Sequence, residues 1–314
     1  MLMLRYALKR LAMLVGGLAL ILLVSFYAIY RLPGDPARMI LGPRASAESV
    51  AEFRAAAGLN APVWQQFARF VRKVFVLDLG ESLSYRRPVA SLLAERSGQT
   101  LRLVGYALSL LAGFAIVLPL FLRAVGLTLV DEVLRALWAG LSAAPPYVLA
   151  LLTLTLLAGV LQVLPAVFDP SRASCWGAAA FALAVYPTAL TSRLFKDALL
   201  AATASEYAVR ARAQGFSEAY ILFREALVNA LAAPLSAIAN GLAYFFTGTF
   251  FVEVAFGVGG IGSLTYDAIR NKDITLLAGV CLLFAAVISA LSATLDVVQM
   301  LLNPRLRRGH AGRL

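Results

Sequence analysis

The hydrophobic residues of this chain occur in long, nearly uncharged runs, a pattern typical of membrane-spanning helices and not of half-buried strands. A helix rises about 1.5 Å per residue, so about 20 apolar residues cross a bilayer core of about 30 Å. The first run follows Arg5, Lys9 and Arg10. It ends at Tyr27 and Tyr30 without the small-residue cleavage site of a signal peptide, so we expect a retained span. The pattern predicts an all-α polytopic membrane protein with six transmembrane helices, at about residues 11–29, 100–122, 136–160, 174–190, 226–252 and 274–302.

These spans divide the chain into four parts. An Ala-rich helix is predicted at about residues 48–57, and an amphipathic helix follows it at residues 63–75. The amphipathic helix is expected either to lie on a surface or to belong to a subdomain that caps the helix ends. Its apolar face comprises Trp64, Phe67, Phe70, Val71 and Val74. The four parts are the N-terminus with the first transmembrane helix (1–30), a helical extracytoplasmic segment (31–98), a core of helices 2–6 with a cytoplasmic loop at 193–226 (99–302), and a cytoplasmic tail (303–314).

Several spans carry residues that are unusual in a membrane helix. Pro145 and Pro146 remove backbone donors and are expected to bend the third span. The fourth span is rich in alanine, so we expect it to be buried among the other helices, which small residues allow to approach closely. The fifth span and the residue after it carry polar groups that either line a pathway with an outer gate or make interhelical hydrogen bonds. These candidates are Asn240, Tyr244, Thr247 and Glu253.

The composition excludes an ordinary soluble domain, because 61% of the residues are hydrophobic and only 14% are charged. The formal net charge of +11 is therefore better explained by basic residues on the cytoplasmic side of the membrane and near lipid headgroups than by nucleic-acid binding. The two short outer loops carry Arg172, Arg270 and Lys272. Because basic residues favour the cytoplasmic side, both termini are expected inside. The predicted inner segments carry Arg5, Lys9, Arg10, Arg123, Arg135, Arg193, Lys196, Arg210, Arg212, Arg224, Arg305, Arg307, Arg308 and Arg313.

The longest polar interruption in the second half of the chain extends from Thr203 to Asn229. Thr203 and Glu206 have the spacing of a capping box, so they predict the start of a short helix. Gly215 is expected to end that helix, and Ser217 is expected to cap a second one. Neither piece is hydrophobic enough to enter lipid. A docking surface is the favoured interpretation, and a plain amphipathic connector is the alternative.

This loop resembles the cytoplasmic EAA-type loop of ABC importer permeases, in the version of the dipeptide, oligopeptide and nickel permeases. The match follows the frame YxxRARAxGxSExxxLxxxALxNAL. Val209 and Arg210 stand where the Glu-Ala pair of the name would be, a pair that the peptide branch often lacks. The residues that carry the resemblance are Ala211, Ala213, Gly215, Ser217 and Asn229.

Motifs elsewhere are similar to the B-type permease subunits of the same family. The stretch VEVAFGVGGIG resembles VExxFxxPGLG, with Gly259 in place of the family's proline. The ending Asn303-Pro304-Arg305 resembles the family's DPR, with Asn in place of Asp. The earlier motifs, in the order and rough spacing of the family, lie at residues 33–36, 58–62, 78–82, 88–89 and 100–101.

The resemblance implies a type I ABC importer permease-like fold and a prokaryotic cell membrane. It implies four kinds of partner around this chain: a second homologous permease subunit, two ATPase subunits, an extracytoplasmic binding protein near residues 31–98, and membrane lipid. It also implies that the loop is a coupling helix. The residues expected to contact the ATPase are Ala211, Ala213, Gly215, Phe216, Ser217, Glu218 and Ile221.

The sequence contains no constellation that predicts catalysis. It has no Walker A motif, no GxSxG elbow and no HExxH pair, and its one histidine is His310 in the tail. We expect no cofactor or metal site in this chain, with ATP and Mg²⁺ bound by partner ATPases. Cys175 and Cys281 lie inside apolar runs. The GxGxxG pattern at residues 257–262 lacks the βαβ unit that dinucleotide binding requires.

We therefore predict the translocation subunit of an ATP-driven ABC importer for peptides or similar small solutes. The alternative is a stand-alone ion-driven secondary transporter or channel, which usually depends on charged groups inside the membrane. Asp296 is the main candidate for such a group, and pairing with an arginine of the tail is the other interpretation of it. Selection of the substrate is expected to rest largely with the binding protein.

Overall fold

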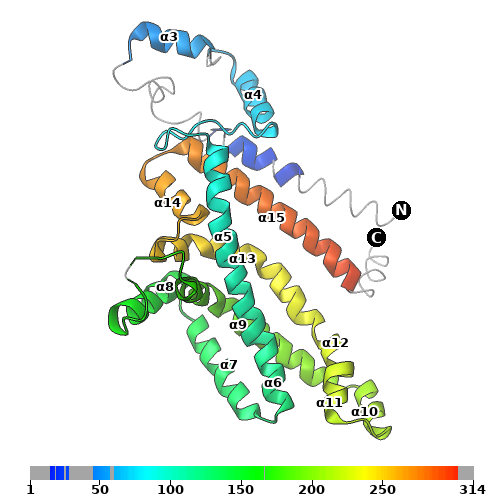
Figure 1. Cartoon of the computed structure of the whole chain (residues 1–314). Helices are drawn as coiled ribbons and strands as arrows, with labels where there is room; N and C mark the ends of the chain where they lie inside the picture. The colour runs from blue at the N-terminus through cyan, green and yellow to red at the C-terminus, as the bar shows by residue number, and fades with distance from the viewer. Residues whose placement is uncertain are drawn as a thin grey trace, which may run out of the picture. The chain divides into compact units, whose positions relative to one another are not determined.

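The computed structural model describes residues 15–17, 19–24, 26–27, 45–56, 60–165 and 167–302, and for residues 240, 243 and 292–302 only the backbone. The regular elements of this part of the chain are helices (Figure 1). Four of them are long and apolar enough to cross a membrane, and up to six spans result if each of two bent helix pairs counts as one. The all-α polytopic prediction is confirmed. The predicted N-terminal basic residues, the motif at 33–36, the tail and the side chain of Asp296 lie outside the described residues.

The chain forms two compact units, and the first combines Met1–Gly98 with Ser263–Ala290. Two helices in it match the sequence predictions to within one residue: α3 (Ala47–Ala56) and α4 (Val63–Phe75). It also contains the first turns of α5 (Val89–Ala112), most of α14 (Ile261–Arg270) and the first part of α15 (Ile274–Leu302). The predicted bounds of the sixth span coincide with those of α15.

A buried carboxylate, that of Asp273, joins two distant segments of the first unit. Its Oδ2 accepts hydrogen bonds from the hydroxyls of Ser82 and Ser84, at 2.6 Å each, and from the Ser84 amide at 2.9 Å. Its Oδ1 accepts one from the Leu276 amide at 3.0 Å, in the first turn of α15. Burial would raise the pKa of Asp273, but these hydrogen bonds outweigh it and hold the pKa below its ordinary value. The charged carboxylate thus fixes residues 82–84 to the start of α15.

The second unit combines Gln99–Gly262 with Leu291–Leu314. Three stretches of π-helix occur in it: two lie within helices that continue beyond them, and the third forms the end of its helix at Val160. Besides the rest of α5, its elements are η1 (Gly113–Val117), α6 (Leu118–Ala124), α7 (Thr128–Ser142), α8 (Pro146–Leu154), η2 (Thr155–Val160), α9 (Ala173–Thr203), α10 (Glu206–Ala213), α11 (Glu218–Tyr220), η3 (Ile221–Ala226), α12 (Leu227–Ala230) and α13 (Ala232–Phe256).

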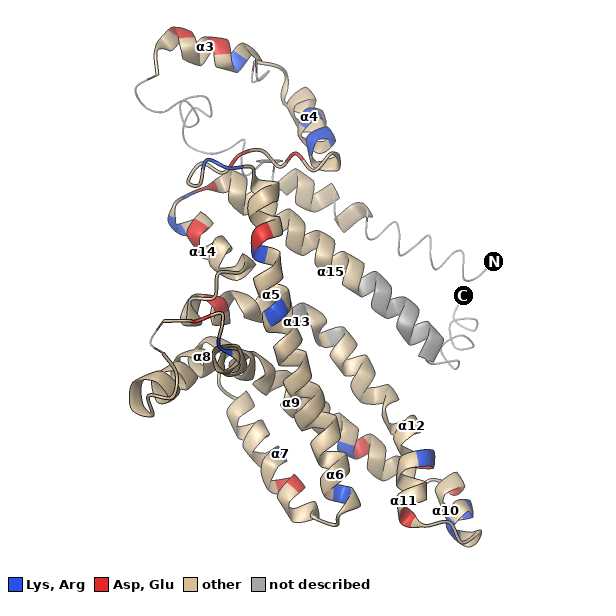
Figure 2. Ribbon diagram, viewed as in Figure 1, with Lys and Arg blue, Asp and Glu red and all other residues tan. Residues whose placement is uncertain are grey.

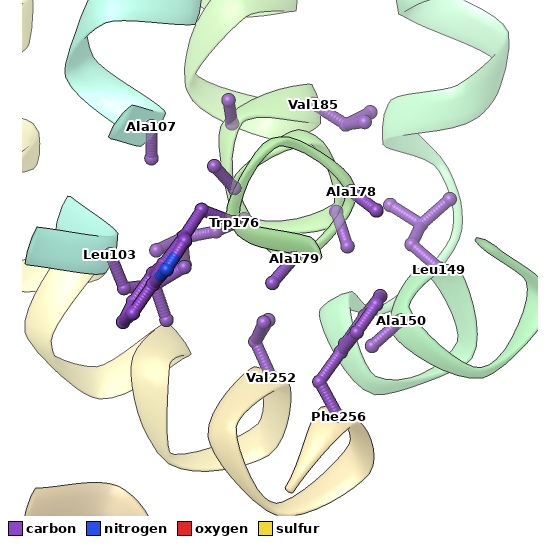
Figure 3. Close-up of a cluster of buried hydrophobic side chains, with 14 of the residues drawn as sticks. Leu103, Ala107, Leu149, Ala150, Trp176, Ala178, Ala179, Val185, Val252 and Phe256 are labelled. Atoms are coloured by element: carbon purple, nitrogen blue, oxygen red, sulfur yellow. The ribbon is translucent and has the colours of Figure 1, made fainter. Parts of the chain in front are cut away.

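The core of the second unit is built around α9. Within its apolar window 61% of the residues are buried, against 28–33% for the other three long spans. Figure 3 shows Ala179 of α9 directed at Val252 of α13, with Trp176 near Leu103 and Ala107 of α5. Small residues permit this close approach. The predicted burial of the fourth span is therefore confirmed.

Four predicted spans differ from the structure in where their helices begin, break or end. The second begins at Val89 and not near residue 100, and the fifth lies in a helix that begins at Glu218 and not near residue 226. The third span begins at Thr128 and is broken before Pro146, with a bend of 107° between its two halves. The two prolines supply no backbone N–H, so the chain turns sharply there and does not only kink. The fourth span does not stop near residue 190, because α9 continues to Thr203. At about 1.5 Å per residue, its 31 residues make a rod of roughly 46 Å, longer than the bilayer core.

The Asp273 anchor leads to a prediction about stability. Asp273→Asn removes the charge that strengthens these hydrogen bonds and replaces one acceptor oxygen with a donor. Each charge-assisted bond contributes about 1.5–3 kcal/mol, so the variant should unfold at a lower temperature in detergent. Because the folded pKa is lowered, the contribution is present at neutral pH and is lost as the pH falls below about 4.

Thermal unfolding followed by circular dichroism at pH 7 and at progressively lower pH measures this effect. The matched control is Asp197→Asn, at an exposed aspartate of α9. Equal unfolding temperatures for the two variants at pH 7 would contradict the anchor.

Candidate functional site

The segment after α9 consists of one short helix, α10, a tight glycine turn, and then a helix that continues from Glu218 to Ala239 and is apolar enough to cross a membrane. The predicted second short helix is therefore wrong, because it is the start of a longer apolar helix. Gly215 has φ +84°, its amide bonds the Arg212 carbonyl at 2.9 Å, and the Phe216 amide bonds the Ala211 carbonyl at 3.1 Å. This pattern is a Schellman motif, so the predicted C-cap is confirmed. Ser217 caps the second helix, because its hydroxyl accepts from the Tyr220 amide at 3.3 Å.

The predicted capping box at the start of the loop is wrong. The hydroxyl of Thr203 donates to the carbonyls of Leu199 and Leu200, in the last turn of α9, at 3.0 Å each. The N-cap position of α10 is occupied by Ser205, whose hydroxyl bonds the Ala202 carbonyl at 2.6 Å. Thr203 is helical because α9 extends beyond the apolar stretch, so it cannot adopt the non-helical conformation of an N-cap.

Arg212 ties the parts of the loop together. Its Nε and Nη2 bond the two carboxylate oxygens of Glu218 at 2.7 and 3.0 Å, and its Nη1 bonds the Thr203 carbonyl at 3.0 Å. The same guanidinium thus holds the end of α9, the body of α10 and the start of α11. The hydrogen bond from Arg212 lowers the pKa of Glu218 and in turn raises that of Arg212. The fork geometry requires arginine, because lysine cannot make a bidentate pair.

Beneath this ion pair the loop has a small apolar core. Ala208 and Ile221 are fully buried, Ala211 is nearly so, and Tyr207 packs against them. Small side chains at positions 208 and 211 leave room for the isoleucine of the facing helix. The core and the ion pair together make the loop a compact body at the end of α9 (Figure 1).

The outer surface of the loop carries apolar side chains in an otherwise charged setting. Phe216 and Tyr220 stack at a centroid distance of 4.5 Å while remaining 45% and 39% exposed. Val209 and Phe223 are also exposed. Figure 2 shows basic and acidic positions on α10 and α11, whereas α13 is uncharged along most of its length. An exposed aromatic pair on a polar loop is typical of a protein contact surface.

The structure separates the predicted contact residues into two groups. Ala211 and Ile221 face the interior of the loop, so in this conformation they support the surface and do not form it. The exposed group comprises Ala213, Gly215, Phe216, Ser217 and Glu218.

Glu253, predicted as part of an outer gate, lies in a buried hydrogen-bonded cluster. Its Oε1 accepts from the Thr100 hydroxyl at 2.6 Å, and its Oε2 accepts from the Gly262 amide at 2.7 Å. The Thr100 oxygen in turn accepts from the Ile261 amide at 2.8 Å. A Cβ at Gly260 would collide with the Glu253 carboxylate. The glycines of this turn therefore allow the backbone to pack closely around the carboxylate.

The other predicted pathway residues have different surroundings. Tyr244 is half-buried with its ring 5.1 Å from that of Tyr186, whereas Thr247 is exposed. The side chain of Asn240 lies outside the described residues. Neither Tyr244 nor Thr247 takes part in the hydrogen bonds that join Glu253 to α5 and to the start of α14.

Sequence reasoning missed two residues that organise these sites. From sequence, Arg212 counts only as a positive charge, although its spacing from Glu218 across a predicted glycine turn is a signal for a pair. Thr100 stands out in the sequence only as part of a motif. No local pattern shows that it meets Glu253, which is 153 positions away.

Together, the apolar helices and the compact polar loop with an exposed aromatic pair define a polytopic membrane protein. Residues 98–308 match the family described as binding-protein-dependent transport system inner membrane component, and residues 3–104 match its N-terminal family. The chain belongs to this family.

Curated relatives are similar along nearly the whole chain. The chain is 29% identical to the glutathione transport system permease protein GsiC of Salmonella paratyphi A over an alignment length of 317. The alignment covers 97% of this chain and 99% of that protein. It is 27% identical to the dipeptide transport system permease protein DppB of Lactococcus lactis subsp. cremoris over 316 residues, 97% of this chain and 100% of that protein.

These findings confirm the predicted family and function. The chain is a membrane-spanning translocation subunit of an ABC importer, and it works with ATPase and binding-protein partners in the inner membrane. They do not favour the alternative of a stand-alone ion-driven transporter.

The Glu253 cluster leads to a second prediction. Thr100→Val preserves the shape of the side chain but leaves the Glu253 carboxylate and the Ile261 amide each without one partner. An unsatisfied buried polar group costs about 1–3 kcal/mol, so the purified variant should unfold at a lower temperature.

Thr247→Val, at an exposed threonine of α13, is the matched control and should unfold near the wild-type temperature. If Thr100→Val and the control are equally stable in a thermal shift assay, the cluster does not hold the turn.

Proposed function

We propose that this subunit imports small peptides or peptide-like solutes and receives the work of ATP hydrolysis through the loop from Thr203 to Asn229. The observation that carries the proposal is the exposed Phe216–Tyr220 pair on a compact loop braced by Arg212. The relatives named for glutathione and dipeptide transport support the substrate class.

The arrangement of partners follows from the same reasoning. A second homologous permease completes the translocation path, and each permease docks on one of two ATPase subunits, which bind ATP and Mg²⁺ and carry out the hydrolysis. The loop faces the cytoplasm, because Arg210, Arg212 and Arg224 make it basic. Both termini then lie on the cytoplasmic side.

The loop is suited to transmit force because it is joined directly to the buried core. Arg212 bonds the carbonyl of Thr203, the last residue of α9. Phe195 and Leu199 of the same helix pack with Leu222 and Ala226 of η3. A displacement of the loop would therefore move α9 as a rod, and α9 is the helix on which the second unit is built.

Reconstitution tests the function. Vesicles that hold the two permeases, the ATPases and ATP should take up a small peptide when the binding protein is present. Vesicles that hold this chain alone with an ion gradient should take up none. Uptake driven by the gradient in the absence of ATPase would contradict the proposal.

A third prediction concerns the glycine turn. At φ +84° an L-residue with a branched Cβ is strained, and left-handed geometry costs about 1–2 kcal/mol per residue. Apart from Gly215 itself and its two neighbours in the chain, no described residue has a heavy atom within 4 Å of the place where a Cβ would stand. The strain is therefore local. Gly215→Val should leave the membrane helices folded and ATP hydrolysis present, but should reduce uptake per ATP hydrolysed.

Gly215→Asn is the control, because asparagine tolerates the left-handed region. It should keep coupling near that of the wild type in an assay that measures ATP hydrolysis and peptide uptake together. Normal coupling in Gly215→Val would count against the loop as the lever.

A further inference from the structure

The helix α4 is amphipathic, and the chain covers only part of its apolar side. Phe67, Phe70, Val71 and Val74 are half-buried along one face. Trp64 lies beside them but is 69% exposed, and Phe75 is 80% exposed. Positions 64 and 75 are about three turns apart, so both side chains project from the same edge of the helix. This edge is the uncovered part of the apolar face.

The contacts of α4 place it at the end of the first membrane span. Phe26 packs with Phe67 at a centroid distance of 5.3 Å and with Phe70 at 5.7 Å. Phe26 stands near the end of the first apolar run, next to Tyr27 and before Tyr30. Tyrosine and tryptophan are enriched where a membrane span meets water. A helix packed on Phe26 therefore lies at the level of the interface.

The turn after α4 exposes further apolar side chains. Phe75, Val76 and Leu77 are consecutive, and Val76 and Leu77 are 70% and 74% exposed. Leu77 has φ +59°, which is uncommon for a residue other than glycine. The turn is nonetheless fixed, because the Asp78 amide bonds the Lys73 carbonyl at 2.9 Å. The turn holds three apolar side chains outward, and an apolar environment would remove them from water and stabilise this arrangement.

The other side of α4 is cationic. Arg69, Arg72 and Lys73 are exposed, and the first turn of the helix has no acidic residue. Lys73 has one acidic neighbour, Asp78, at 3.5 Å, and the side chain stays 64% exposed. The basic residues thus border the exposed apolar edge, as in helices that lie in the headgroup region of a bilayer.

We propose that α4 and the turn after it form an interfacial membrane anchor. Trp64, Phe75 and Leu77 insert at the boundary of the acyl chains, and Arg72 and Lys73 contact anionic headgroups. The occupant of the uncovered apolar edge is thus the bilayer itself. Charge complementarity with anionic lipid and continuity with the first span favour the bilayer over a protein partner as the occupant. The anchor does not depend on coupling through the α9–α13 loop.

Depth measurements in the assembled transporter test the anchor. In a background with Cys175→Ala and Cys281→Ala, a single cysteine is introduced by Phe75→Cys and labelled with an environment-sensitive fluorophore. Gln65→Cys, on the polar side of α4, is the matched control. Vesicles of phosphatidylcholine, with and without phosphatidylglycerol, contain lipids that carry a quencher on the acyl chain, and iodide is the aqueous quencher.

The label at position 75 should emit at shorter wavelength and be quenched by the acyl-chain group, whereas that at 65 should be quenched by iodide. Adding Arg72→Glu should reduce the acyl-chain quenching at 75 in vesicles with phosphatidylglycerol. Equal iodide quenching at 65 and 75 would overturn the anchor. Protection of position 75 only after addition of the binding protein would overturn it in favour of a protein partner. Unchanged quenching in Arg72→Glu would overturn the headgroup contact.

Discussion

Close packing of small side chains around α9 is the interaction on which the second unit depends. Lipid chains are as apolar as leucine, so the hydrophobic effect does not draw two membrane helices together once both are in the bilayer. Association then depends on how closely the helix surfaces approach. The run of alanines from Ala178 to Ala184 supplies that approach on α9, and Gly248 supplies it on α13, where a Cβ would come within 2.7 Å of Leu183. Trp176 fills the space near α5.

Buried carboxylates solve a different problem, the connection of segments where helices end. The first turn of any helix has amides without intrahelical partners, and lipid cannot satisfy them. Asp273 accepts from the first turn of α15, and Glu253 and Thr100 accept from amides at the start of α14. Each carboxylate or hydroxyl lies far in sequence from part of what it binds. These polar clusters therefore fix turns that apolar packing alone would leave undefined.

The sequence predicted helices well and helix ends less well. Hydropathy reports where a segment enters lipid, and for α15 this coincides with the helix. For α9 it does not, because the backbone hydrogen bonds continue past residue 190 in a polar stretch that still forms helix. The break at Pro146 was predicted as a bend, but its size depends on how both halves pack on α9. Such packing is not encoded in any local pattern.

The candidate site shows the same division between local and distant signals. The glycine turn and the Ser217 cap were predictable, because each depends on residues within a few positions. The burial of Ile221 was not, since it depends on Ala208 and Ala211 leaving space on the facing helix. From sequence alone, an apolar residue in a polar loop is easily interpreted as a surface contact, because its neighbours in space are not known. In this loop the exposed apolar residue is Phe216, whereas Ile221 is buried and holds its helix against α10.

The proposed lever requires a stiff joint between the loop and the core, and α9 provides this joint by its continuity. The helix α9 is continuous from the buried core to Thr203, even through Pro187. Arg212 then bonds the last carbonyl of that helix and, through Glu218, the helix that follows the glycine turn. The loop is therefore joined to α9 without a flexible linker, as the proposed transmission of force requires.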